Sequence, residues 1–198
     1  MAYWLIPAEP AHSFFHRIIE DLARRYAAPM FEPHVTVYVG ADRSHSARQA
    51  LAESARECAP IKLKPLRIRQ SDEFVKTLFV QFASSAELRQ VNEIIRHAAQ
   101  DSSQYELKPH LSLLYNKMEA ALRRELAASI VVPFSLISFD SIKAVRCVSP
   151  TQSRSDVEAW GVGAATVPSS FRAERSVVEA ATQRTKSARP GFQARRVR

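Results

Sequence analysis

The chain of 198 residues has only two cysteines, Cys58 and Cys147, and no long apolar run. Two cysteines form no disulfide framework, and this pair lacks the spacing of metal ligands, so we expect a reducing, cytoplasmic environment. No apolar stretch approaches the roughly 20 residues of a membrane-spanning helix. The first ten residues, MAYWLIPAEP, have no basic start, and their apolar run stops at Pro7. We therefore expect neither a signal peptide nor membrane contact.

Positive charge is concentrated at one end of the chain, whose net charge is +8. Residues 171–198 hold eight basic residues against two acidic ones, so the remainder of the chain is nearly neutral. This end also has few apolar residues and no clear periodicity. We predict that residues 1–167 form a two-lobed domain and that residues 168–198 form a basic, disordered tail. Weak nucleic-acid contact is expected through this tail alone.

The body repeats one order of predicted elements. Period-two alternation and β-branched runs indicate the strands, and apolar residues at helical spacing indicate the helices. The predicted elements are a strand (3–6), helix (11–27), strand (33–39), helix (46–58) and strand (61–69), then a strand (74–82), helix (85–100), strand (109–115), helix (119–129) and strands within 134–147 and 156–167. This order predicts an α+β fold built from duplicated β-α-β units, with lobes that exchange near residues 70–75.

One short pattern, PHVTV and then PHLSL, occurs twice, 76 positions apart and at the same step of each half. Side chains alternate along a strand, so His34 and Thr36 share one face while the valines between them share the other. His110 and Ser112 share a face in the same way. Pairing the two halves about a pseudo-twofold axis brings two imidazoles and two hydroxyls together across a cleft.

These four groups suit the cleavage of a phosphodiester. The attacking water must lose a proton and the departing sugar oxygen must gain one, and two imidazoles with pKa values near 6.5 divide these tasks. The hydroxyls of Thr36 and Ser112 are suited to donate hydrogen bonds to the nonbridging oxygens, where charge develops. We expect no metal and no cofactor, because neither motif has the additional His, Cys, Asp or Glu donors that a metal site needs.

The doubled H-x-[ST] motif resembles that of the two-histidine (2H) phosphoesterase superfamily. Within it, YWLIPAE, FEPHVTVYVG and KPHLSLLY are similar to the cyclic phosphodiesterases of plants and yeast, over about residues 2–166. The resemblance implies two antiparallel sheets that face a central cleft, with helices outside. It implies hydrolysis of 2′,3′-cyclic nucleotides to nucleoside 2′-phosphates, and also hydrolysis of ADP-ribose 1″,2″-cyclic phosphate. It also implies catalytic roles for His34, Thr36, His110 and Ser112.

Three aromatic residues are candidate substrate contacts. The resemblance implies contact by Trp4 and Tyr115, and Trp4 fits either a stacking role or a place in the core. By strict alternation Tyr115 points away from His110, so it reaches the cleft only if its strand ends or twists near Leu114. Phe74, at the start of the first predicted strand of the second half, is the candidate for the opposite stacking partner.

Two other functions fit parts of the sequence. One is a phosphodiesterase or ligase-like enzyme acting on RNA ends or 2′–5′ linkages, which predicts a basic cleft, whereas the motif flanks offer chiefly Lys108 and Arg146. The other is a non-catalytic nucleic-acid-binding protein that acts through its tail. A monomeric hydrolase with a small cyclic-phosphate nucleotide as its substrate explains more of the sequence than either of them.

Overall fold

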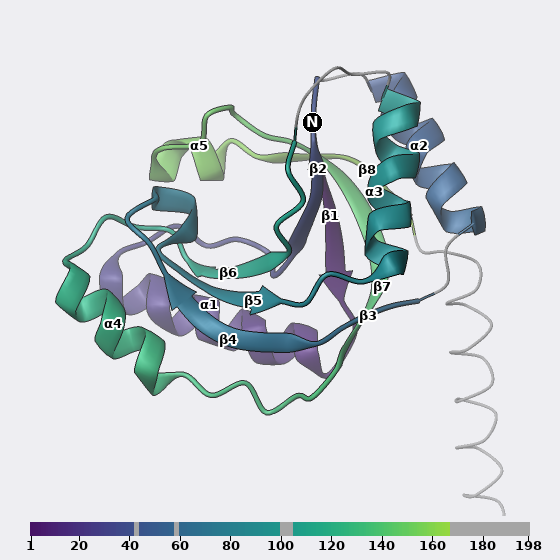
Figure 1. The fold of residues 1–198 in the computed structure, drawn as a ribbon. Coiled ribbons are helices and arrows are strands. Elements are labelled where there is room, and N and C mark those ends of the chain that lie inside the picture. The colour runs from purple at the N-terminus through teal and green to yellow at the C-terminus, as the bar shows by residue number, and fades with distance from the viewer. Residues whose placement is uncertain (42–43, 58–59, 100–104, 167–198) are drawn as a thin grey trace, which may run out of the picture.

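The computed structural model describes residues 1–41, 44–57, 60–99 and 105–166 (Figure 1). Cys58 and the predicted basic tail, residues 168–198, lie outside the described residues. The elements are β1 (Ala2–Pro7), α1 (Ala11–Tyr26), β2 (Val35–Val39), α2 (Ser44–Glu57), β3 (Ile61–Leu63), β4 (Pro65–Gln70), the 3₁₀ turn η1 (Phe74–Lys76), β5 (Leu78–Phe82), α3 (Ala86–Ala99), β6 (His110–Leu114), α4 (Ala120–Ser129), β7 (Ile137–Arg146), α5 (Arg154–Glu158) and β8 (Gly161–Thr166).

The long helices form where apolar residues recur every three to four positions. In α1 the side chains of Phe15, Ile19 and Leu22 are buried on one face, as the spacing predicts. The next helix of this kind, α3, begins after Ser85, whose hydroxyl oxygen accepts a hydrogen bond from the backbone N–H of Leu88 at 3.1 Å. None of the helices within the described ranges is long and apolar enough to cross a lipid bilayer.

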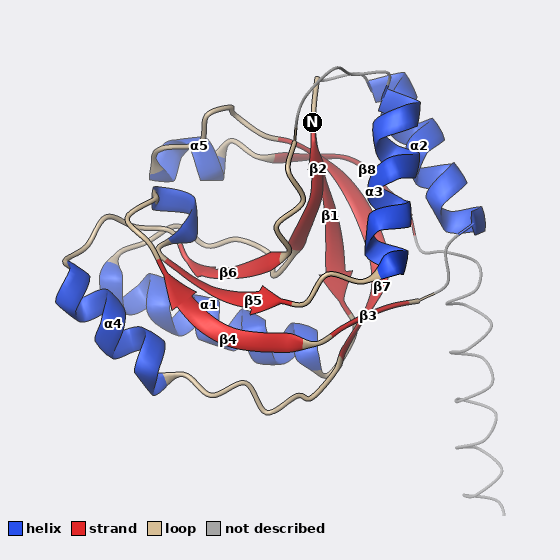
Figure 2. Cartoon of the chain, viewed as in Figure 1, coloured by secondary structure: helices blue, strands red, loops and turns tan. Residues whose placement is uncertain are grey.

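The strands form one strongly curved sheet in the order β3-β7-β1-β2-β6-β5-β4, with β8 added beside β7 (Figure 2). The paired strands run antiparallel. The α+β class is therefore confirmed. The description as two separate sheets needs correction, because β2 and β6 pair at Val35 and Leu111 and join the two halves. This junction brings the two motif strands side by side.

The helices lie outside the sheet, as expected, and interlock the two halves. Helix α1 follows β1 in the chain but packs on β6, and α3 packs on β2 and α2, while α4 lies against β4. Figure 1 shows α1 and α4 with one half of the sheet and α2 and α3 together with the other. The chain passes from one half to the other between β3 and β4, at Lys64. The motif strands are thus held between helices that come from both halves of the sequence.

The apolar residues of both motifs form the centre of the core. Val35, Val37, Leu111 and Leu113 have no measurable exposure and belong to one hydrophobic cluster. Complete burial of this set on one face leaves the alternate positions to face the other side of the sheet. The predicted alternation of the motif strands is therefore confirmed.

The segment predicted as a closing strand, residues 156–167, begins differently. Residues up to Glu158 belong to the short helix α5, and β8 begins only at Gly161. The helix forms because Ser153 and Asp156 make a reciprocal capping box, in which each side chain accepts a hydrogen bond from the backbone N–H of the other residue. This turn places Trp160, which lies between helix and strand, next to Trp4 of β1.

Candidate active site

A cavity of about 370 Å³ lies over β1, β2 and β6, and His34, Thr36 and His110 all line it. The antiparallel pairing of Val35 with Leu111 explains this convergence. In this antiparallel pairing His34 lies opposite Ser112, and Thr36 lies opposite His110. Each histidine is therefore next to the hydroxyl residue of the other motif. The structure thus brings both imidazoles and the Thr36 hydroxyl to one cavity.

Both imidazoles are held in the same way. The Nδ1 atom of His34 lies 2.6 Å from the carbonyl oxygen of Glu32, and Nδ1 of His110 lies 2.7 Å from the carbonyl oxygen of Lys108. A carbonyl oxygen only accepts, so each Nδ1 carries the hydrogen. The Nε2 atom of each neutral ring is then the one that accepts a proton. The two-residue spacing of this contact is the same in both motifs.

His34 lies in an aromatic enclosure and is only 5% exposed. The indole of Trp4 stacks on its ring at 3.8 Å between centroids, and Phe31 and Trp160 meet it edge-on at 6.3 Å. Burial lowers the pKa of His34 to about 4; the hydrogen bond to the carbonyl of Glu32 opposes this shift, and the nearby imidazole of His110 adds to it. The resting form of His34 at neutral pH is therefore the uncharged ring.

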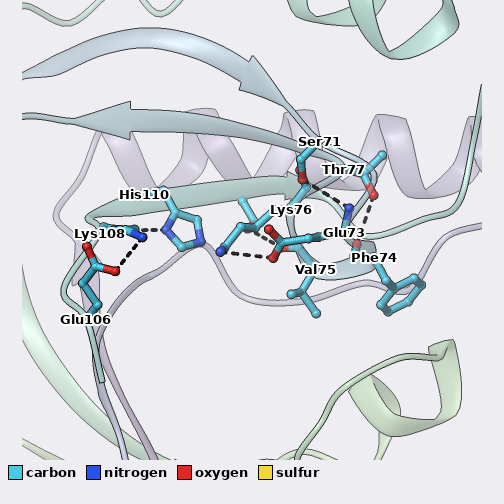
Figure 3. A network of polar contacts seen from close by, with 10 residues as sticks. Ser71, Glu73, Phe74, Val75, Lys76, Thr77, Glu106, Lys108 and His110 are labelled. Carbon is cyan, nitrogen blue, oxygen red and sulfur yellow. Dashed lines mark hydrogen bonds and ion pairs between the residues drawn. The ribbon is translucent and has the colours of Figure 1, made fainter. Parts of the chain in front are cut away.

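His110 is less enclosed and lies beside charged groups. Phe79 meets its ring edge-on at 5.4 Å. Burial lowers the pKa of His110, the carbonyl of Lys108 opposes the shift, the ammonium of Lys76 lowers the pKa further and Glu73 raises it. Figure 3 shows Lys76 extending toward the His110 ring from the turn that precedes β5. Both imidazoles thus have lowered pKa values, but only His110 has a cation beside it.

The two hydroxyl residues of the motifs differ in their surroundings. Thr36 is half-buried and lines the cavity, and its backbone carbonyl accepts a hydrogen bond from the phenol of Tyr105 at 3.1 Å. Ser112 is 5% exposed, does not line the cavity, and donates its hydroxyl proton to the carbonyl oxygen of Val75 at 2.8 Å. The Ser112 hydroxyl, which the sequence predicts as a donor to a phosphate oxygen, thus donates to a backbone carbonyl in this structure.

The three aromatic candidates occupy different positions. Trp4 lines the cavity, but it is 5% exposed and one face of its ring is covered by His34. It is therefore a buried residue at the edge of the cavity, and its contact with substrate stays a prediction. Tyr115 also lines the cavity, because β6 ends at Leu114 and releases the next residue from strict alternation. Phe74 is not among the lining residues; it packs behind Tyr115 at 6.1 Å.

The lining residues that the sequence analysis missed include Lys76, Tyr105 and Trp160. Lys76 was placed within a predicted strand, although the polar residues 70–73, which precede that strand, are typical of a turn. Burial raises the pKa of Tyr105 to about 12, so its phenol stays a neutral donor. Trp160 reaches the cavity because it directly follows α5. The capping pattern at residues 153–156 could have predicted that helix from the sequence.

Acidic and thiol groups do not gather at the cavity. Among the described residues, no group of three or more His, Cys, Asp and Glu side chains is arranged to hold a metal ion. The carboxylate of Glu32, next to the first motif, instead pairs with the ammonium of Lys143 at 2.5 Å. Cys147 lines the cavity as a free thiol, and burial raises its pKa to about 11, which keeps it protonated.

The curved antiparallel sheet, with an H-x-[ST] motif on each of two adjoining strands and both imidazoles in one cavity, defines a 2H phosphoesterase. The model of the family described as "Cyclic phosphodiesterase-like protein" matches residues 1–165, so the chain belongs to this family. It is accordingly a phosphodiesterase, and the resemblance on which the sequence analysis relied is confirmed.

The chain is similar to several known proteins. The cyclic phosphodiesterase of Arabidopsis thaliana is 26% identical over 163 residues, which cover 79% of this chain and 88% of the relative. The structure of TT0787 from Thermus thermophilus is similar with a TM-score of 0.53 and 15% identity, covering 85% of this chain and 98% of that one. LigT of E. coli, in a complex with 3′-AMP, has a TM-score of 0.49, 15% identity and the same coverage. The likeness to TT0787 supports the fold alone.

Proposed function

We propose that the cavity hydrolyses small cyclic phosphodiesters, 2′,3′-cyclic nucleotides in the first place, without a metal ion or cofactor. The observation that carries this proposal is the matched pair of imidazoles, each fixed through Nδ1 by a carbonyl two residues earlier. Fixing both rings in this way leaves two Nε2 atoms in one cavity, where one accepts a proton and the other supplies one. The volume of about 370 Å³ suits a mononucleotide.

The reaction needs one neutral and one protonated ring. In our assignment Nε2 of His110 takes the proton of the attacking water as the new P–O bond forms opposite the departing oxygen. Nε2 of protonated His34 gives its proton to O3′ as the old P–O bond breaks, which leaves a nucleoside 2′-phosphate. A bound phosphate anion favours the protonated form of His34 because opposite charges attract in a buried site. Thr36 lines the cavity, and in this proposal its hydroxyl donates a hydrogen bond to a nonbridging oxygen.

The alternatives from the sequence differ in how well they fit. An enzyme for RNA ends or 2′–5′ linkages needs contacts to several phosphates, but only Lys76 and Lys108 are cationic side chains among the described residues that line the cavity. ADP-ribose 1″,2″-cyclic phosphate remains in the proposed substrate class. Membership of a phosphodiesterase family argues against a non-catalytic body. Nucleic-acid contact by the tail, a monomeric state and a cytoplasmic location stay predictions.

The substrate and the assignment of roles are tested by phosphorus NMR on 2′,3′-cyclic AMP. We expect conversion to the 2′-phosphate, because His34 faces the departing O3′ in the proposed orientation. A 3′-phosphate product would reverse the roles of the two histidines and leave the two-imidazole chemistry standing. The same assay with 2′–5′ oligonucleotides is the control. Rapid cleavage of these oligonucleotides, with no turnover of the cyclic nucleotide, would contradict the proposed substrate class.

The pH dependence of kcat/KM follows from the two lowered pKa values. His110, as a base, works only above its pKa, and His34, as an acid, works only below its own. Since both pKa values are lowered in the free enzyme, both limbs of the bell-shaped profile of kcat/KM against pH move to lower pH. We expect the optimum of kcat/KM to lie below about pH 6.5, the ordinary histidine value. The profile of kcat extends to higher pH, because the bound phosphate raises the pKa of His34. An optimum of kcat/KM above about pH 7.5, a full unit beyond that ordinary value, would contradict this account.

A further inference from the structure

The face of β6 that carries His110 continues across β5, the strand beside it. In the pairing of these two strands, Phe79 lies opposite Ser112 and Gln81 lies opposite His110. Side chains of residues directly opposite each other in an antiparallel pair project from the same face of the sheet. The ring of Phe79 meets the His110 ring edge-on at 5.4 Å, in agreement with this placement. Phe79 and Gln81 therefore extend the motif face beyond the cavity, whose lining includes neither of them.

Two arginines of β4 lie on the same face. Arg69 is opposite Phe79, and Arg67 is opposite Gln81, in the pairing of β4 with β5. The Nη1 atom of Arg69 donates a hydrogen bond to Oε1 of Gln81 at 3.5 Å, which places this guanidinium on the motif face. Figure 1 shows β6, β5 and β4 in succession. Both arginines thus begin two strand spacings, or about 10 Å, from the strand that carries His110.

The positive groups that line the cavity each have a partner within the protein. These pairs are Lys76 with Glu73, Lys108 with Glu106, and the ammonium of Met1 with the carbonyl oxygen of Gly40. Arg67 and Arg69 differ, because they are exposed and neither forms an ion pair with an acidic side chain within the described ranges. Side chains two residues apart on a strand begin roughly 7 Å from each other. Two guanidinium groups at this spacing are suited to hold one phosphate between them.

An aromatic ring followed by two guanidinium groups is the composition of a nucleotide subsite. Bases stack on aromatic side chains, and positive side chains contact the phosphates. Phe79 is half-buried, so part of its side chain stays exposed. The cavity of about 370 Å³ suits one mononucleotide. A ligand that reaches Phe79 and the two arginines must therefore continue past the nucleotide that the cavity holds.

We propose that Phe79, Arg67 and Arg69 form a second nucleotide subsite, and that the preferred substrate is a short oligoribonucleotide whose 3′ end is a 2′,3′-cyclic phosphate. This inference rests on the proposed function and names its substrate class. The terminal nucleotide occupies the cavity, where its cyclic phosphate is hydrolysed as described above. The preceding nucleotide lies along β5, and the phosphodiester that links the two nucleotides contacts the arginines and is not cleaved. The second subsite supplies, outside the cavity, the further phosphate contacts that the cavity lacks.

Arg124 of α4 provides a matched control. It is exposed, and together with Arg67 and Arg69 it lines a second cavity, of about 450 Å³, along β4. Helix α4 packs against the opposite face of β4, where Gln70 accepts a hydrogen bond from Arg123 at 2.9 Å. The change Arg124→Gln therefore removes one positive charge near β4 but away from the motif face.

The test compares two substrates of the full chain, 2′,3′-cyclic AMP and the dinucleotide adenylyl-(3′→5′)-adenosine 2′,3′-cyclic phosphate. The readout is the ratio of kcat/KM for the dinucleotide to kcat/KM for the cyclic mononucleotide. The variants are Arg67→Gln/Arg69→Gln and Phe79→Leu, with Arg124→Gln as the control. Leucine keeps an apolar contact at position 79, and thermal unfolding confirms that each variant is folded.

We expect a wild-type ratio of at least about ten, in the range of one stacked base. The change Arg67→Gln/Arg69→Gln lowers this ratio by roughly fivefold or more, because two charged donors to the linking phosphate are lost. Phe79→Leu lowers it through the lost stacking, and Arg124→Gln leaves it within about twofold of the wild-type value, because solvent and salt screen a charge on the other face. Rising salt lowers the wild-type ratio for the same reason.

Two results would overturn the inference while the proposed function stands. One is a wild-type ratio near one, and the other is an unchanged ratio in Arg67→Gln/Arg69→Gln. An equal loss in Arg124→Gln would place the linking phosphate in the cavity between β4 and α4, which overturns the assignment to the motif face.

Product binding separates this inference from the proposed function. Calorimetry compares adenosine 2′-phosphate with adenylyl-(3′→5′)-adenosine 2′-phosphate, and this readout does not depend on turnover. We expect the dinucleotide to bind the wild type at least about tenfold more tightly, and this difference to shrink in Arg67→Gln/Arg69→Gln. A wild-type protein that binds in this way but hydrolyses neither substrate would contradict the proposed function and support the subsite. Equal binding of the two products, or no binding of either, would overturn the subsite.

Discussion

Replacement of either motif histidine by asparagine, His34→Asn or His110→Asn, lowers kcat for 2′,3′-cyclic AMP by roughly 10²–10⁴-fold, the usual contribution of a positioned acid or base. Asparagine keeps a side-chain N–H that is able to bond the carbonyl of Glu32 or Lys108, where Nδ1 bonds in the native protein. It has no group that exchanges a proton near neutral pH. The loss therefore reports proton transfer, with little change in local structure.

His97→Asn serves as the matched control for this result. His97 lies in the last turn of α3 and does not line the cavity, so this change should leave kcat unaltered. Steady-state kinetics of the three variants, with thermal unfolding to confirm that each is folded, makes the comparison. Native turnover in either motif variant would end the two-imidazole account.

The second large effect is expected at Trp4, where the change Trp4→Ala affects both stability and pH dependence. Trp4 is 5% exposed, stacks on His34 at 3.8 Å and meets Trp160 edge-on at 5.3 Å. Truncating a buried tryptophan costs about 3–5 kcal/mol of unfolding free energy. Water then reaches the His34 ring, and because burial is the main cause of its lowered pKa, that pKa rises.

The direction of the pH effect follows from the role of His34 as the acid. A higher pKa keeps the ring protonated to higher pH, so the optimum of kcat/KM, which lies midway between the two pKa values, moves to higher pH in Trp4→Ala. Urea unfolding measures the stability, and a pH–rate profile measures the optimum. Trp4→Phe is the control, because a phenyl ring preserves part of the stack and should give intermediate values. A Trp4→Ala protein with native stability and an unshifted profile would refute the proposed enclosure of His34.

The faces of the two motif strands could be predicted from the sequence, because alternation along a strand depends only on neighbouring residues. Period-two alternation places Val35 and Val37 on the opposite face from His34 and Thr36, and the burial of both valines agrees with it. The repeated order of elements likewise predicted the class of the fold. The joining of the two halves into one sheet depends on a contact between Val35 and Leu111, which no local pattern encodes.

The partner of Ser112 could not be predicted, because the carbonyl of Val75 lies 37 positions earlier in the chain. The pattern of residues 74–82 suggested one strand, whereas residues 74–76 form a 3₁₀ turn that Thr77 fastens to Asn116. Tertiary hydrogen bonds here override the local preference for a strand. The position of Lys76 at the cavity is a consequence of that turn.

Trp4 shows a different limit of the sequence. A tryptophan on a strand next to a motif strand fits both a substrate contact and a core residue, and alternation does not separate the two. In the structure Trp4 packs with Ala2 and Ile6, lines the cavity and covers one face of His34, and its contact with substrate stays a prediction. Its expected influence on the pKa of His34 arises from this contact, which becomes visible only in three dimensions.

The most direct test of the central claim, that two imidazoles carry out the hydrolysis, is turnover of 2′,3′-cyclic AMP by the wild-type protein in EDTA. The account predicts the same kcat in EDTA as after addition of Mg²⁺, Mn²⁺ or Zn²⁺, and no measurable turnover by the double variant His34→Asn/His110→Asn in either condition. Activity that disappears in EDTA and returns with a divalent ion would contradict the claim, as would turnover by the double variant.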